Sequence, residues 1–152
     1  MCSSNKGRVL LLLLVLACLN SSPNHEAEAI NILSIVIHNN LPSGSQFYFT
    51  SDLVKDKYFL QPGQTFGKLA NFEARDCTMV YNYVCAKLFL YDPKTDSGHN
   101  KVFWSVRKDG IYRSWDDSNW EKKTDYDWSG TLLGTPMGTS DLHSKDYECK
   151  SK

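Results

Sequence analysis

The sequence predicts an all-β fold built from many short strands in a single domain, either a β-sandwich or a barrel. Side chains alternate between apolar and polar over several short segments, which is typical of strands with one buried face. Turn residues separate these segments at regular intervals. No window shows the i, i+3, i+4, i+7 spacing of an amphipathic helix. These three observations together favour strands throughout.

The clearest strand pattern lies between residues 102 and 112. One face carries apolar side chains and the other mixed ones, that is, Val102, Trp104 and Val106 against Phe103, Ser105 and Arg107. Asp109-Gly110 follows, and these residue types readily adopt the positive φ of a tight turn. We therefore predict a β-hairpin, with the turn at Asp109-Gly110 and the second strand starting at Ile111.

Other strands follow from the same kind of pattern. The predicted short strands are residues 30–37, 47–50, 58–60 and 65–69. Residues 78–91 form the longest β-like segment, and because it exceeds the usual strand length we expect a bend or turn inside it. The polar segments 51–57 and 92–100 lie between strands, so we predict loops there.

The N-terminus has the layout of a secretory signal peptide. Lys6 and Arg8 precede an unbroken apolar run over residues 9–19, which is too short to span a bilayer. Cleavage after Ala29 fits the small-x-small rule, and a cut near residues 20–23 is the alternative. We predict a signal peptide over residues 1–29, cleaved within residues 20–29, and a secreted, extracellular protein.

Charge and composition exclude some classes of partner. The chain of 152 residues has 17 Lys and Arg against 17 Asp and Glu. A balanced charge does not provide the basic surface that binds nucleic acid, nor a polybasic membrane-binding surface. We expect no nucleic-acid partner and no membrane insertion.

Three cysteines follow the predicted leader, so one thiol is left without a partner in an oxidising compartment. Cys77 and Cys85 are the nearest pair along the chain, and we predict a disulfide between them. The alternative joins Cys85 to Cys149 and ties the C-terminal segment to the core. No CxxC motif is present, and we predict no metal site.

The residues suggest no catalytic centre. His38, His99 and His143 are far apart in sequence and lack an evident Ser or Cys partner. The acidic pairs Asp116-Asp117 and Asp125-x-Asp127 offer oxygen ligands for Ca²⁺, but we interpret them as solvated acidic loops. We predict no enzyme and no cofactor.

Three tryptophans lie among charged residues: Trp115, Trp120 and Trp128. Exposed, they are candidates for stacking on sugar rings or anchoring a protein partner, since rigid aromatic rings bind at a low entropy cost. The other interpretation is that they close the edge of the fold.

Several segments, taken in order, resemble the plant self-incompatibility S1 family, the S-protein homologues. They are Asn39-Asn40-Leu41, Leu60-Gln61-Pro62-Gly63 with Phe66, Thr78, Phe89-Leu90-Tyr91-Asp92, and the block from Trp104 through Ser105-Val106-Arg107 and Asp109-Gly110-Ile111 to Tyr112. The resemblance covers about residues 32–115, and the block starting at Trp104 is its most specific part.

The resemblance implies an antiparallel β-sandwich, which we place over residues 30–128. Residues 129–152 are rich in Gly, Ser, Thr and Asp and have few core-type side chains, so we predict a polar, loosely ordered tail there. The resemblance also implies a secreted, non-enzymatic recognition or signalling protein with a cell-surface receptor as partner. The loops 51–57 and 92–100 are its candidate contact surfaces. A carbohydrate-binding sandwich that uses the three tryptophans is the alternative. The family's usual cysteines are absent after the Asn-Asn-Leu turn and before the Trp104 block, so its usual disulfides cannot all form.

Overall fold

The computed structural model describes residues 31–133 and 148–150, and these residues form strands and no helix. This confirms the predicted all-β fold. The strands are β1 (Leu33–Asn39), β2 (Phe47–Ser51), β3 (Tyr58–Phe59), β4 (Thr65–Ala70), β5 (Arg75–Tyr81), β6 (Val84–Tyr91), β7 (Lys101–Arg107), β8 (Gly110–Ser114), β9 (Glu121–Lys122), β10 (Gly130–Leu133) and β11 (Glu148–Lys150).

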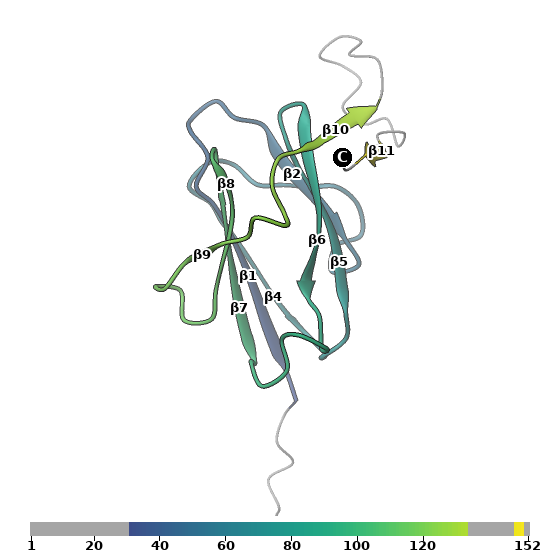
Figure 1. The fold of residues 1–152 in the computed structure, drawn as a ribbon, viewed down its shortest axis with the longest axis vertical. Helices are drawn as coiled ribbons and strands as arrows, with labels where there is room; N and C mark the ends of the chain where they lie inside the picture. The colour runs from purple at the N-terminus through teal and green to yellow at the C-terminus, as the bar shows by residue number, and fades with distance from the viewer. Residues whose placement is uncertain (1–30, 134–147, 151–152) are drawn as a thin grey trace, which may run out of the picture. The chain divides into compact units, whose positions relative to one another are not determined.

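The strands form two sheets packed face to face (Figure 1). Sheet A has the order β4-β1-β7-β8-β9, and sheet B has the order β11-β10-β6-β5-β2-β3. The pairs are antiparallel except for β1 and β7, which run parallel. The predicted antiparallel sandwich is confirmed, with this one parallel pair inside it. β1 and β7 are far apart along the chain, so no hairpin forces them to run in opposite directions.

The core lies between the two sheets, and strand alternation decides which side chains enter it. The alternate residues of β1 and β7 are fully buried: Leu33, Ile35 and Ile37 on one, Val102, Trp104 and Val106 on the other. Trp104 also donates its indole Nε1–H to the carbonyl of Leu90, 3.1 Å away in sheet B. The side chain predicted to be core therefore also hydrogen-bonds across the two sheets.

The hairpin turn is one residue earlier than predicted. Arg107 pairs with Gly110, so Lys108 and Asp109 form the two-residue loop and Gly110 is the first residue of β8. Gly110 has φ of +147°, and a Cβ there would lie 2.7 Å from Cε of Lys122. The end of the lysine side chain can move away, so the glycine is needed for its backbone conformation, and not as a residue of the loop.

The bend predicted within residues 78–91 is the turn between β5 and β6. Asn82 and Tyr83 form it, and Asn82 adopts φ of +51°. Asparagine is one of the few residue types other than glycine that accept this conformation.

Two turns meet through Asn39, which is fully buried. Its Nδ2 donates to the carbonyl of Leu60 at 2.7 Å, and its Oδ1 accepts from the backbone N–H of Leu41 at 3.0 Å. Its own carbonyl accepts from the N–H of Gly63 at 2.7 Å. These bonds join the Asn-Asn-Leu and Leu-x-Pro-Gly segments into one hydrogen-bonded corner. They also give the buried side-chain amide of Asn39 the partners that a buried polar group needs.

The tail prediction is wrong for the residues that the structure describes beyond residue 128. Gly130–Leu133 and Glu148–Lys150 are β10 and β11, and they extend sheet B beyond β6. β10 pairs with the edge of β6, where Gly130 lies opposite Cys85. Composition alone did not reveal these strands, because backbone pairing and a covalent bond hold them. Residues 134–147 of the predicted tail, and the predicted leader, lie outside the described residues.

The disulfide joins Cys85 to Cys149, the alternative pairing, and Cys77 is a free, buried thiol. The predicted Cys77–Cys85 bond is wrong because the two side chains lie on opposite faces of sheet B. Cys77 pairs with Leu88 across the hairpin and packs in the core between the sheets, whereas Cys85 pairs with Val80. Val80 and Cys85 pack with Cys149 in a separate cluster.

Candidate functional site

Three loops meet at one end of the sandwich, which we call the loop end: residues 52–57, 71–74 and 92–100. β2 and β6 both run toward this end, and β5, which lies between them, starts from it. The connection after β6 lies at the bottom of the molecule in Figure 1. Both loops predicted to contact a partner are therefore on the same end, where the sequence alone placed them only between strands.

Arg75 ties two of these loops together. Its side chain is largely buried, and its guanidinium forms ion pairs with Asp52 and with Glu73, the latter at 3.3 Å. Asp52 belongs to the loop after β2 and Glu73 to the loop before β5. One planar, permanently charged group therefore holds both loops in a fixed relation.

Asp96 fixes the third loop to sheet A. Its side chain is almost fully buried, and its Oδ1 accepts from Nη1 of Arg113 at 2.8 Å. Its Oδ2 accepts from the backbone N–H of Asp92 at 3.0 Å. A buried carboxylate that is both charge-paired and hydrogen-bonded is costly to displace, so the loop over residues 92–100 has a rigid base.

Trp115 packs at the same end, between the imidazole ring of His99 and the guanidinium of Arg113. The ring of His99 stacks on it in parallel with centroids 3.9 Å apart, and the guanidinium carbon of Arg113 lies 4.4 Å from its ring. A ring stacked at this distance fills one face of the indole, so the guanidinium takes the other. This tryptophan braces the loop, and its faces are occupied.

A cavity of about 490 Å³ opens between the loops 71–74 and 92–100. Its lining combines aromatic rings with amides and a hydroxyl, from Asn31, Phe72, Tyr91, Pro93, Ser97, Gly98, His99 and Asn100. Burial, together with the nearby carboxylates of Asp96 and Asp92, raises the pKa of the Tyr91 hydroxyl. That hydroxyl therefore stays protonated. The volume is in the range of ligand pockets, and the lining suits a neutral polar group with an apolar face.

The other two candidate tryptophans lie elsewhere. The guanidinium carbon of Arg107 lies 5.5 Å from the ring of Trp120, on sheet A. Trp128 donates its indole N–H to the carbonyl of Arg107 at 2.9 Å and packs against Tyr81, with ring centroids 5.6 Å apart. The structure therefore does not bring the three tryptophans together into one binding platform.

One group of residues was missed in the sequence. His38 lies between Thr65 and Asp117, with Nδ1 2.9 Å from the hydroxyl of Thr65 and Nε2 3.0 Å from Oδ1 of Asp117. A hydroxyl, an imidazole and a carboxylate in this order resemble the arrangement that activates a nucleophile. Thr65 is exposed on β4, and it lines neither of the two hollows described in this subsection.

The acidic pair at residues 116–117 has its first carboxylate occupied by the protein. Asp116 accepts hydrogen bonds from Ser114, Ser118 and Asn119, the closest being the Nδ2 of Asn119 at 2.6 Å. In the described residues no group of three or more His, Cys, Asp or Glu side chains is placed to hold a metal ion. These bonds, first of all those from Asn119, hold the pKa of Asp116 well below its usual range.

We expect Asp116 to contribute to acid stability. Because its folded pKa is depressed, its stabilisation is present at neutral pH and is lost as the pH falls from about 4 toward the lower folded pKa. The melting temperature of the wild type should therefore drop more steeply between about pH 4 and pH 2 than that of Asp116→Asn. Parallel curves for the two proteins would contradict this role.

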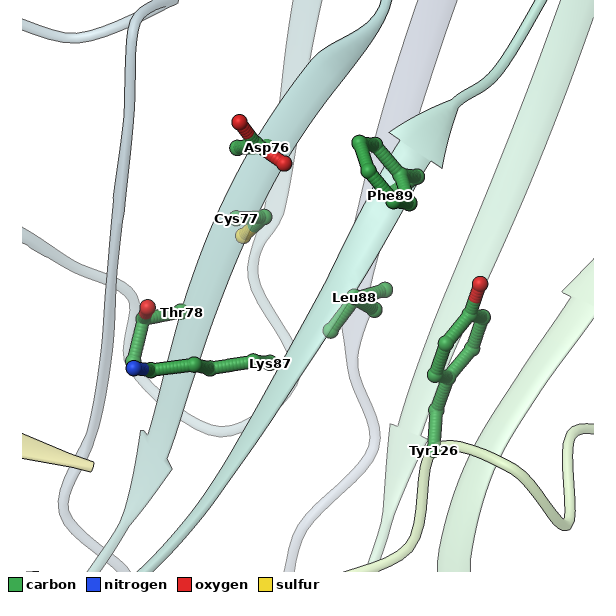
Figure 2. A pocket seen from close by; sticks show the side chains of 7 residues that line it. All are labelled: Asp76, Cys77, Thr78, Lys87, Leu88, Phe89 and Tyr126. Atoms are coloured by element: carbon green, nitrogen blue, oxygen red, sulfur yellow. The ribbon is translucent and has the colours of Figure 1, made fainter. Parts of the chain in front are cut away.

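A second hollow, of about 250 Å³, lies on the β5–β6 hairpin (Figure 2). Figure 2 shows Asp76, Cys77 and Thr78 along one strand and Lys87, Leu88 and Phe89 along the next, with Tyr126 coming from the connection before β10. Burial, and then the charges of Asp52 and Asp76, raise the pKa of the Cys77 thiol. This thiol therefore stays protonated and unreactive at neutral pH.

No helix in the described residues is long and apolar enough to cross a membrane. Comparisons with protein-family models, with curated proteins and with solved structures find no match to this chain. The resemblance to the S-protein homologues therefore remains a prediction.

Proposed function

We propose that the protein is a secreted, non-enzymatic recognition or signalling protein that binds a cell-surface partner through the loop end. The observation that carries this proposal is the cavity between residues 71–74 and 92–100, which lies on a rigid base. Binding surfaces in sandwich folds are commonly formed by loops held at one end of a stable frame. Here Arg75 and Asp96 hold the loops without taking part in the lining of the cavity.

The cysteines support an extracellular location. The Cys85–Cys149 bond closes 64 residues of chain, and such bonds persist in oxidising compartments. Together with the predicted signal peptide, this favours secretion. A role like that of the S-proteins, in which a receptor on another cell recognises a small secreted sandwich, agrees with the resemblance and with the polar, loop-built surface.

We expect Phe72→Ala to weaken binding of the secreted protein to intact cells at least about tenfold, because an aromatic side chain in a pocket is a typical hot spot. Saturable binding of fluorescently labelled protein measures this. Phe89→Ala is the matched control, since Phe89 is 40% exposed on the outer face of sheet B. Equal binding by both variants and the wild type would contradict the loop end as the contact surface. Turnover of an ester, peptide or glycoside would contradict the non-enzymatic part of the proposal.

Carbohydrate binding is the second candidate function, and the cavity lining favours it over a purely apolar ligand. Asn31, Asn100 and Ser97 offer hydrogen bonds beside the ring of Phe72, and a sugar ring uses such a combination of polar groups and an aromatic ring. A glycan array that responds to the wild type and to Trp120→Ala but not to Asn100→Ala would place a sugar in this cavity. Loss of the signal in Trp120→Ala would favour the tryptophans instead.

A further inference from the structure

Arg107 lies at the end of β7 and faces outward from sheet A, at the opposite end of the strand from the loop end. Seven residues of strand place it about 20 Å from that end. Its Nε donates to the hydroxyl oxygen of Ser105 at 2.9 Å, and the same oxygen accepts from Nδ2 of Asn40 at 2.8 Å. Ser105 is fully buried, so its hydroxyl fixes the Nε edge of the guanidinium against sheet A.

Two aromatic rings hold the guanidinium from the side. Its carbon lies 4.1 Å from the ring of Tyr112 and 5.5 Å from that of Trp120. The hydroxyl of Tyr112 donates to Oδ2 of Asp109 at 2.6 Å, which fixes the ring. A guanidinium fixed by stacking and by one hydrogen bond loses little further freedom when it binds a ligand.

Arg107 is the one arginine in residues 31–133 without a carboxylate partner. Arg75 and Arg113 pair with carboxylates, as described above, whereas no carboxylate within this range lies within ion-pair distance of Arg107. The nearby Asp109 accepts from Tyr112 and pairs with Nζ of Lys122 at 3.7 Å. The hydroxyl of Tyr112, more than any other contact, lowers the pKa of Asp109. The carboxylate of Asp109 therefore has Tyr112 and Lys122 as its partners, and it forms no ion pair with Arg107.

We propose that Arg107 is a binding site for a single carboxylate, and that its ligand is an acidic side chain in a peptide segment of a protein partner. The Nη groups of a guanidinium match a carboxylate in bidentate geometry. On the same face, Trp120 lies beside Arg107 and meets the ring of His38 edge-on. That ring stacks on Phe103, which pairs with Val36 across β1 and β7, and both of these are half-buried. This apolar surface fits the apolar side chains that flank an acidic residue in a peptide.

An acidic polysaccharide fits the site less well. Such a chain carries a carboxylate on each repeated sugar and needs several free cations in a row. Here Lys122 already pairs with Asp109, so Arg107 and the exposed turn residue Lys108 are the cations left beside the site, and they do not form a row of several. The charge pattern therefore favours a peptide with an isolated Glu or Asp.

The test is a nuclear magnetic resonance titration of the full secreted chain with the blocked peptide acetyl-Ile-Glu-Ile-amide. We expect shifts of the Trp120 indole and Arg107 Nε signals, and no such shifts with acetyl-Ile-Gln-Ile-amide. Arg107→Lys keeps the charge but loses the bidentate geometry, so the dissociation constant should rise at least about fivefold. Lys108→Gln removes the neighbouring exposed charge and should leave the constant unchanged within about twofold.

Three results would overturn the proposal. One is an equal response to the Glu and Gln peptides in the wild type, which needs no variant and so does not depend on folding. Another is unchanged affinity in Arg107→Lys with a wild-type melting temperature. The third is tighter binding of oligogalacturonate than of the peptide, because this would assign the site to an acidic polysaccharide.

Discussion

Replacing Trp104 with alanine is expected to lower the free energy of unfolding by about 3–5 kcal/mol, the usual cost of removing a large aromatic side chain from a core. Trp104 is fully buried between the sheets. The substitution leaves a cavity, and it also leaves the carbonyl of Leu90 without its donor. Urea unfolding followed by far-ultraviolet circular dichroism measures the change.

Phe103→Ala is the matched control, because Phe103 is the adjacent residue on the same strand and faces outward, half-buried. Its loss should stay below about 1.5 kcal/mol, since fewer contacts disappear and water reaches the site. Equal losses in the two variants would mean that the strand does not divide its side chains between core and surface.

Breaking the Cys85–Cys149 bond is the second large effect. Cys149→Ser should lower the free energy of unfolding by about 2–5 kcal/mol, because the bond restricts the unfolded chain over a long loop. β11 should also separate from β10, since three residue pairs alone hold it there. Unfolding by urea with and without a reducing agent measures both effects, and wild-type stability in Cys149→Ser would contradict the account.

Gly130→Val tests the same region by a different route. A Cβ on Gly130 would lie 2.6 Å from the carbonyl oxygen of Cys85 and 2.8 Å from each sulfur of the disulfide. We expect β10 to be displaced and the fraction of molecules with the bond to fall. Gly67→Val on β4 is the control, because nothing lies within 4 Å of a Cβ at Gly67.

The hairpin and the core faces could be predicted because strand alternation is a local property. The alternation at residues 102–106 was enough to place Trp104 in the core, and the length of the segment 78–91 was enough to require a turn. The turn at Lys108–Asp109 was misplaced by one residue, because Gly110 is required by its own positive φ at the start of β8 and not by the loop itself.

The disulfide was misassigned because distance along the chain was given more weight than the face of the strand. In a hairpin with a two-residue turn at residues 82–83, Cys85 lies opposite Val80. Val80 and Cys77 are three residues apart and therefore face opposite sides of sheet B. The predicted turn inside this segment, once placed, would have excluded the Cys77–Cys85 pair.

The candidate sites could be predicted only in part. The loop over residues 92–100 was identified, but its contact with residues 71–74 depends on the order of strands in sheet B. The pairing of His38 with Thr65 depends on the register of β1 and β4, across 27 residues of chain. Strand order and register are long-range properties, and no local pattern encodes them.

The most direct test of the whole account is mass spectrometry of the secreted protein after digestion without reduction. We expect a mature N-terminus created by cleavage within residues 20–29, a cross-linked peptide that joins Cys85 to Cys149, and an unmodified Cys77. A protein retained in the cell with residues 1–29 intact, or a cross-link between Cys77 and Cys85, would contradict it.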